Sequence, residues 1–217
     1  MPTADAVLSW ATVVANDWRG LAIAWHVALA SFLIAVMRGR VTSRSAAHLL
    51  VLPLISVAAV AWRTGNPFNG LVFTAVSAML LRSARRLPSS VATPARRHWQ
   101  AAGVLLVLFG WLYPHFIETD SWLAYAYASP FGLLPCPTLA GVAGWTLVFG
   151  GFRSAMWTGT VAGTTVLYGA IGVFRLGVIL DAGLLAAGTL LVLAAASLRL
   201  GLFNQHSNRA FEIRSES

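Results

Sequence analysis

The sequence predicts an all-α integral membrane bundle of about seven transmembrane helices, with the N-terminus outside and the C-terminus cytosolic. Three observations predict this class. Hydrophobic residues make up 58% of the chain and charged residues 10%, the mean hydropathy is +0.72, and long apolar segments recur. Soluble domains carry about 25% charged residues. We therefore expect a multi-pass protein of the bacterial inner (cytoplasmic) membrane.

The predicted spans follow from segment length, because a helix needs about 20 mainly apolar residues to cross the hydrocarbon core. Seven segments approach that length: residues 20–37, 46–62, 67–82, 99–116, 134–152, 155–174 and 180–198. Between the second and third of these, Gly65 and Asn66 are turn formers, and Pro67 suits the first turn of a helix. This pair of segments is predicted to form a helical hairpin.

Residues 1–19 are predicted to be an interfacial N-terminal segment. Within it, residues 5–18 place aromatic and apolar side chains near the helical period, but the stretch is too short to span. No basic residue precedes Arg19, so the charged start of a cleavable signal peptide is missing and we expect the segment to be retained. The seven-helix domain then covers residues 20–200, and residues 201–217 form a polar cytosolic tail.

Arginine placement predicts the orientation. All fifteen basic residues are arginines, and one set of alternate loops holds only Arg19, Arg63 and Arg175. The other set contains Arg38, Arg40, Arg44, Arg82, Arg85, Arg86, Arg96, Arg97, Arg153, Arg199, Arg209 and Arg214. Because cytosolic loops carry the excess of basic residues, the second set is predicted to be cytosolic. Short clusters between apolar segments indicate topology signals and anionic-lipid contacts, with the bilayer as partner and no nucleic acid.

Most of the residues with unusual chemistry fall on the predicted outer side. They are Arg63, Asn66, Pro67, Asn69, Tyr113, Pro114, His115, Glu118, Asp120, Cys136, Arg175 and Asp181. Any site is therefore expected at this face. Arginine and amide side chains suit an anionic group, and the candidate ligand-binding residues are Arg63, Asn66, Asn69, Tyr113, Arg175 and Asp181.

Cys136, the only cysteine, lies between two prolines and has two interpretations. With His115 and a carboxylate such as Glu118 it would supply the mixed sulfur, nitrogen and oxygen donors that zinc or copper accepts, although no short ligand spacing is present. Alternatively, Pro135 and Pro137 set the start of a helix and the cysteine is a small packing residue. The sequence requires no cofactor, and a bound metal ion at Cys136, His115 and Glu118 is one hypothesis.

Four spaced elements, "GNPFNG", "YPHFIE", "FGLLPCPT" and "LGVILDAGLL", resemble the DUF6064 family of uncharacterised bacterial multi-pass membrane proteins. The likeness extends from the first predicted span to the last. It implies the same multi-pass architecture, and it points to Asn66, Pro67, Tyr113, Pro114, Cys136, Pro137 and Asp181. It implies no particular activity.

Several membrane chemistries are disfavoured by absent residues. Without lysine there is neither a retinal Schiff base nor a phosphate-binding G-x-x-x-x-G-K-[ST] loop. The motifs H-E-x-x-H and G-x-S-x-G are also missing, so no catalytic residue is assigned and an enzyme is the less favoured class. His26, the deepest ionisable residue, is expected to hydrogen-bond a neighbouring helix. The alternative is an axial haem ligand, paired with His115.

Three functions remain open. If the protein binds or handles a small ligand or metal, Cys136, His115 and Asp181 are predicted to lie close enough together to contact the same ligand. A small transporter built on a parallel three-helix repeat predicts a polar pathway, with Arg63 and Arg175 as equivalent positions. An accessory or assembly subunit of a larger membrane complex predicts a broad face of small residues, such as Gly159 and Gly163, for partner subunits.

Overall fold

The computed structural model describes residues 3–199, with side chains to residue 196. Its helices are α1 (Ala4–Asp17), α2 (Arg19–Met37), α3 (Ser43–Arg63), α4 (Pro67–Ala84), α5 (Arg97–Leu112), α6 (Ala124–Ala128), α7 (Pro135–Val148), η1 (Gly150–Arg153), α8 (Ala155–Ala170), η2 (Ile171–Arg175) and α9 (Asp181–Arg199). The predicted all-α class is confirmed for this part of the chain, where a single β-bridge joins Thr42 and Val91. The predicted tail, residues 201–217, lies outside the described residues.

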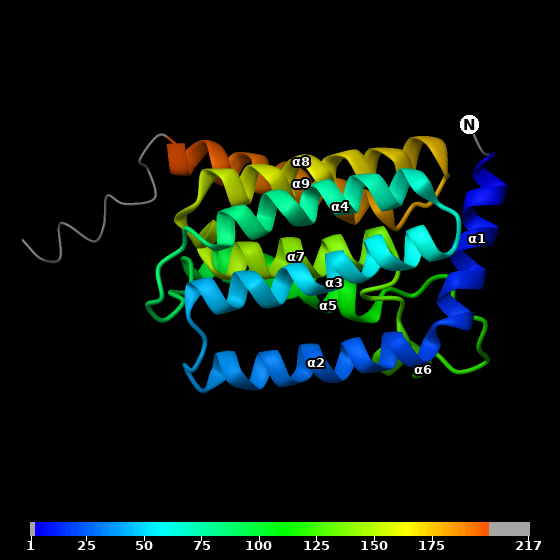
Figure 1. Ribbon diagram of the computed structural model, residues 1–217, viewed down its shortest axis with the longest axis horizontal. Helices are drawn as coiled ribbons and strands as arrows, with labels where there is room; N and C mark the ends of the chain where they lie inside the picture. The colour runs from blue at the N-terminus through cyan, green and yellow to red at the C-terminus, as the bar shows by residue number, and fades with distance from the viewer. Residues whose placement is uncertain (1–2, 200–217) are drawn as a thin grey trace, which may run out of the picture.

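The long helices run side by side along the longest axis of the molecule, while α1 crosses one end of them (Figure 1). Neighbouring pairs are α3 with α4, α5 with α7, and α8 with α9. We call the end covered by α1 the α1 end; it contains the connections 64–66, 113–134 and 176–180. The opposite end contains the connections 38–42, 85–96 and 149–154, and we call it the basic end.

Capping residues explain where several helices start. Thr42 forms a capping box with Ser45 at the start of α3, and Asn66 accepts a hydrogen bond from the Asn69 amide at the start of α4. Pro67 occupies the first turn of α4, as the sequence predicts. The expected hairpin of α3 and α4 is present.

Two predicted segments are longer than the helices that form. The segment 99–116 ends as a helix at Leu112, because Tyr113 precedes a proline and such residues avoid the helical region. The segment 134–152 ends at Val148. Beyond it, Gly150, Gly151, Phe152 and Arg153 all have positive φ, which reverses the chain toward α8.

Two helices in the described range, α2 and α3, are long and apolar enough to cross a membrane. The helices α5, α7 and α8 contain 16, 14 and 16 residues. A 14-residue helix is about 21 Å long, less than the roughly 30 Å of the hydrocarbon core. The structure therefore provides two candidate spans, and the seven-span bundle stays a prediction.

Helix α7 forms the centre of the bundle, and every residue in it except Cys136 is buried. Its packing against α5 depends on glycine: a Cβ at Gly144 would lie 2.6 Å from the Gly103 carbonyl oxygen, and a Cβ at Gly110 would lie 2.6 Å from the Gly141 nitrogen. By contrast, Cβ atoms at Gly159 and Gly163 would meet open space. The G-x-x-x-G pattern of α8 is therefore not used for packing within the described chain.

Helix α2 lies apart from the other long helices in Figure 1 and is joined to them by large side chains. The Phe32 ring packs edge-on against Trp145 with centroids 4.8 Å apart, and the Trp25 indole donates a 3.0 Å hydrogen bond to Ser56. His26 Nε2 lies 3.1 Å from the Trp111 carbonyl oxygen and its Nδ1 2.9 Å from that of Ala22. The Nε2 contact with Trp111 matches the expected interhelical hydrogen bond, and the Nδ1 contact with Ala22 is the alternative bond, because a neutral imidazole donates from only one of its nitrogens.

Candidate ligand-binding site at the α1 end

A pocket of about 540 Å³ opens at the α1 end. Its walls come from α1, the α3–α4 turn, the start of α7, the end of α8 and the start of α9. Most of the lining side chains are apolar. The polar or charged side chains in the lining are Asn66, Asn69, Cys136, Tyr168, Arg175 and Asp181.

Asp181 is the centre of a buried polar cluster on the pocket wall. Its Oδ1 accepts a 2.7 Å hydrogen bond from the Tyr113 hydroxyl, and its Oδ2 accepts a 3.2 Å hydrogen bond from the Cys136 thiol. Asp181 is 1% exposed and Tyr113 0%. We call these three residues the Tyr113–Cys136–Asp181 cluster; it joins the end of α5, the start of α7 and the start of α9.

Proline and threonine position the cysteine. Pro135 occupies the first turn of α7, where a missing amide proton costs little, and places Cys136 next to it. The preceding loop is fixed by Thr138, whose hydroxyl accepts from the Gly132 amide at 2.8 Å and donates to the Leu134 carbonyl at 2.7 Å. The prolines therefore do set the helix start, and they also aim the thiol at Asp181.

Gly172 makes room for the carboxylate. A Cβ at this position would overlap the Asp181 side chain, so the backbone of Gly172 lies directly against it. Gly172 belongs to the π-helical turn Ile171–Arg175, and its carbonyl accepts a 2.9 Å hydrogen bond from the Val178 amide. Single π-helical turns occur frequently at functional sites.

The protonation of Tyr113, which lies in the connection after α5, supports the direction of its hydrogen bond. Burial raises the pKa of Tyr113 far above its ordinary value, and the nearby Cys136 and Asp181 act in the same direction. The hydroxyl therefore stays protonated at every physiological pH and donates to Asp181.

A second polar pair lies on the same pocket wall. The Tyr168 hydroxyl of α8 donates a 2.8 Å hydrogen bond to Asn69 Oδ1 near the start of α4. Both residues are buried, at 5% and 7% exposure respectively. This pair ties the α3–α4 hairpin to α8 beside the pocket.

Helix α1 closes one side of the pocket. Its residues Ala11, Val14 and Ala15 are buried against the bundle. The Trp10 indole donates to Thr64 O at 3.2 Å and to Thr64 Oγ1 at 3.1 Å, and the Asn16 amide donates to the Phe116 carbonyl at 3.0 Å. The predicted N-terminal helix is thus also part of the candidate site.

The structure brings together most of the predicted ligand-binding residues. Asn66, Asn69, Arg175 and Asp181 line the pocket, and Tyr113 is bonded to Asp181. Arg63 lies at the end of α3 and does not line the pocket. Tyr168, Gly172 and Trp10 were not among the site residues predicted from the sequence, although a tryptophan in a short amphipathic helix is a signal for a docked helix.

The predicted metal ligands are not assembled. Across the described residues, no group of three His, Cys, Asp or Glu side chains is placed to hold a metal ion. Cys136 lines the pocket, but the His115 ring packs on Phe116 with centroids 4.1 Å apart. The Glu118 amide donates a 3.0 Å hydrogen bond to Asn16 Oδ1, which holds this connection against α1.

Comparisons with known proteins return no relative: no family model, no curated protein and no solved structure matches the chain. The resemblance to the DUF6064 family therefore stays a prediction.

Proposed function

We propose that the chain is a seven-span protein of the bacterial inner membrane that binds a small, mainly apolar molecule from the outer side. The bound molecule would occupy the pocket at the α1 end and present a hydroxyl or amino group to Asp181.

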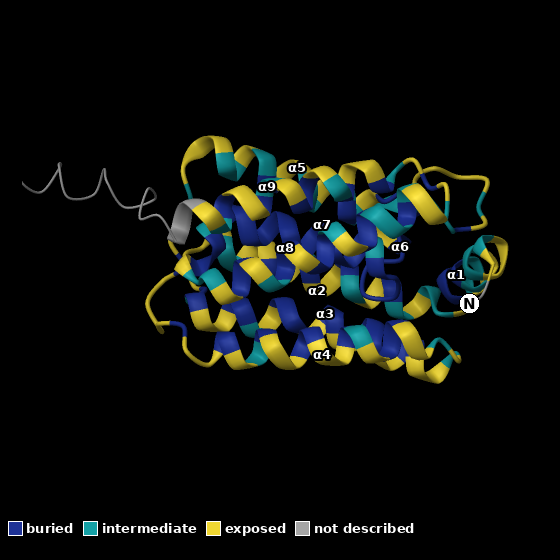
Figure 2. Cartoon of the chain, turned by 90° about the horizontal axis from the view of Figure 1, so that it is seen from above, coloured by how far each residue is buried: buried dark blue, intermediate teal, exposed yellow. Residues whose placement is uncertain are grey.

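Exposed apolar side chains support the membrane topology. Large hydrophobic residues also face outward on helices other than α2 and α3, including Leu71 on α4 at 62% exposure and Leu105 on α5 at 68%. Figure 2 shows that exposed residues follow the outer faces of the long helices, while buried residues face inward. A surface of this kind is stable in lipid, whereas soluble monomers rarely expose large apolar patches.

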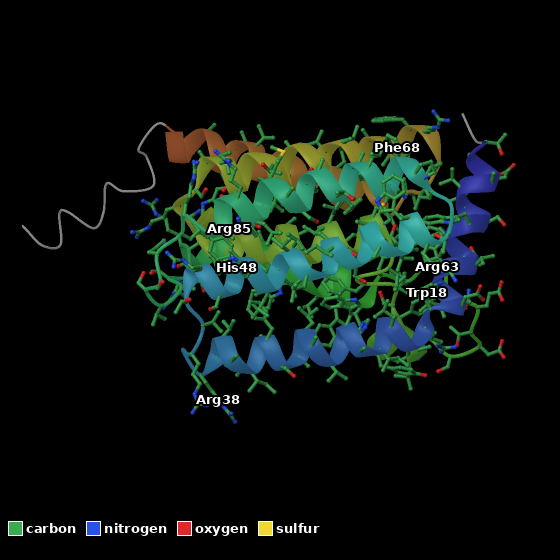
Figure 3. All side chains as sticks on the ribbon, viewed as in Figure 1. Trp18, Arg38, His48, Arg63, Phe68 and Arg85 are labelled. Carbon is green, nitrogen blue, oxygen red and sulfur yellow. The ribbon has the colours of Figure 1, made fainter. Side chains whose placement is uncertain are left out.

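Charge segregation supports the orientation. Arg38 and Arg85 lie at the basic end and Arg63 at the α1 end, as Figure 3 shows. In the described chain the basic end also carries Arg40, Arg44, Arg82, Arg86, Arg96, Arg97 and Arg153, whereas the α1 end carries Arg19, Arg63 and Arg175. Under the positive-inside rule the α1 end faces outward.

The single observation that carries the ligand class is the position of Asp181 on the wall of a mainly apolar pocket. An ionised carboxylate offers about four lone-pair sites, and Tyr113 and Cys136 occupy two of them. A ligand hydroxyl or amine would complete the set, while its apolar part would contact side chains such as Trp10, Phe68 and Leu134. Pockets of about 300–1,000 Å³ are typical of small-molecule sites.

A transporter is a second candidate, because the hairpins α3–α4 and α8–α9 have matching turns. Arg63 and Arg175 each precede, by two residues, a glycine in the left-handed region: Gly65 at φ +74° and Gly177 at φ +68°. Both turns lie at the α1 end. Each predicted repeat also includes a preceding helix, α2 in the first and α7 in the second, and the match does not extend to these, since α7 is buried on all sides and α2 is peripheral.

The ligand class is tested with matched eight-carbon probes on the purified protein in lipid nanodiscs. We expect n-octanol and n-octylamine to raise the melting temperature and octanoate, which Asp181 would repel, to leave it unchanged. The substitution Asp181→Asn should abolish the response to n-octylamine, whereas Asp120→Asn, an exposed carboxylate at the same end, should preserve it. Equal responses in the two variants, or stabilisation by octanoate alone, would contradict the proposal.

A further inference from the structure

A second pocket, of about 670 Å³, lies at the basic end. Three arginines line it: Arg86 and Arg96 from the α4–α5 connection, and Arg153 from the turn before α8. Hydroxyl groups of Ser43, Ser83, Ser90, Thr93 and Ser154 also belong to the lining. The lining thus combines cationic side chains with neutral hydrogen-bonding groups.

No carboxylate within the described range neutralises these arginines. The acidic residues in that range are Asp5, Asp17, Glu118, Asp120 and Asp181. All five belong to α1, to the 113–134 connection or to the start of α9, and therefore to the α1 end. The positive charge around the second pocket is left for an anion from outside the described chain.

Helix direction adds to the positive potential. The helices α3, α5 and α8 all start at the basic end, and Ser43, Arg96 and Ser154 at or beside these starts line the pocket. The N-terminal end of a helix carries a partial positive charge, although the first amides of α3 already donate to the Ser90 and Pro88 carbonyls. Three helix starts and three arginines therefore surround one hollow.

The turn that presents Arg153 is held in an unusual backbone conformation. Phe152 and Arg153 have φ of +52° and +55°, a region that non-glycine residues rarely adopt. Phe152 is fixed there by its ring contacts with Phe149 and Trp157, at centroid separations of 5.3 and 5.2 Å. Aromatic packing thus keeps the residue before Arg153 in place at the edge of the pocket.

Serine hydroxyls continue the polar lining between the helices. Ser83 Oγ lies 3.1 Å from Ser154 Oγ, and Ser154 Oγ accepts a 3.2 Å hydrogen bond from the Trp157 amide. Ser83 is 2% exposed, so this pair forms the inner part of the wall. Arginine forks and serine hydroxyls are the donors that bind phosphate oxygens.

We propose that the pocket at the basic end binds a phosphate group, carried by an anionic phospholipid or by a free phosphate compound. This inference does not depend on the ligand proposed for the α1 end. Only the lipid source depends on the proposed topology, which would place the pocket at the level of the cytosolic headgroups. Juxtamembrane arginines attract anionic headgroups there.

The test measures phosphate and lipid binding by full-length protein carrying matched substitutions. Arg96→Gln and Arg153→Gln remove two pocket charges, while Arg38→Gln and Arg40→Gln remove two exposed charges of the same end that do not line the pocket. Inorganic phosphate is titrated in neutral detergent by calorimetry. Phosphatidylglycerol and phosphatidylcholine are compared by native mass spectrometry.

We expect the affinity for the phosphate-bearing probe to fall by about tenfold or more in the Arg96→Gln and Arg153→Gln double variant and to stay within about twofold in the control. Binding of inorganic phosphate would identify a free phosphate compound, and binding of phosphatidylglycerol without inorganic phosphate would identify a headgroup. Equal losses in both double variants, or no loss in either, would overturn the proposal. If the pocket variant has a lowered melting temperature without ligand, Arg86→Gln provides the same comparison at a third pocket arginine.

Discussion

The thiol of Cys136 donates a 3.2 Å hydrogen bond to Asp181, a residue 45 positions later in the chain. The sequence leaves open whether its only cysteine has a chemical role or a packing role, and this contact bears on both. The flanking prolines start α7, as the structural interpretation expects, but the side chain also belongs to a hydrogen-bonded cluster on a pocket wall. Cys136 is therefore both a helix-start residue and part of the candidate site.

Replacing the thiol should distinguish hydrogen bonding from packing. Cys136→Ser keeps a donor for Asp181, whereas Cys136→Ala leaves Oδ2 without this partner. We expect the alanine variant to lose roughly 1–3 kcal/mol of stability and the serine variant less. Reversible unfolding in detergent, followed by circular dichroism, measures both. A serine variant less stable than the alanine variant would contradict the hydrogen-bonding role.

Gly172 should tolerate no side chain. Gly172→Ala places a methyl group into the Asp181 carboxylate, so Asp181 or the π-helical turn must shift, and we expect a loss of about 1–3 kcal/mol. Gly159→Ala on α8 is the matched control, because its Cβ meets open space. Alanine is the better helix former, so the control should be neutral or more stable by up to about 1 kcal/mol. Similar melting temperatures for the two variants would argue against the contact.

Trp10 should hold α1 over the pocket. Trp10→Phe keeps an aromatic ring but removes both hydrogen bonds to Thr64. We expect faster amide hydrogen exchange in residues 4–17, with little change in α7, since only the attachment of α1 is weakened. Trp122→Phe, an indole at 76% exposure, is the control. Unchanged exchange in α1 would show that the apolar contacts of Val14 and its neighbours suffice.

The orientation can be tested by cysteine labelling in intact cells. In a Cys136→Ser background, Asp120→Cys introduces a thiol at the α1 end and Ser89→Cys one at the basic end; both positions are exposed. A membrane-impermeant maleimide should label position 120 directly and position 89 only after permeabilisation. The reverse pattern would place the N-terminus in the cytosol, and labelling of both from outside would contradict the membrane topology.

Hydropathy predicted where the long helices lie, since each predicted span overlaps one of α2, α3, α4, α5, α7, α8 and α9. It did not predict the ends of α5 and α7. Those ends depend on local backbone chemistry: the proline after Tyr113 and the left-handed residues after Phe149. In a hydropathy profile, apolar residues that continue past a helix end, such as Phe116, cannot be distinguished from apolar residues within the helix.

The sequence predicts which end of the bundle holds the candidate site residues, because the direction of the helices alternates. Asn66, Cys136 and Asp181 follow or start helices at one end of the bundle, so alternation of direction alone places them near each other. Which of them touch depends on helix rotation and on the room left by neighbours such as Gly172, and neither can be read from one sequence. His115 and Glu118 satisfied the same topological argument, but they lie in a connection whose course is determined by contacts with α1.

The burial of α7 on all sides has a consequence for mutational tolerance. In a saturation mutagenesis experiment, almost every position of Pro135–Val148 should reject polar or larger residues, whereas the outward positions of α2 should accept many hydrophobic ones. Cys136 is the exception in α7, because it is the one residue of this helix that is only partly buried. A small hydrogen-bonding residue such as serine should still support folding at this position, so a strict requirement for cysteine there would report on what the pocket does.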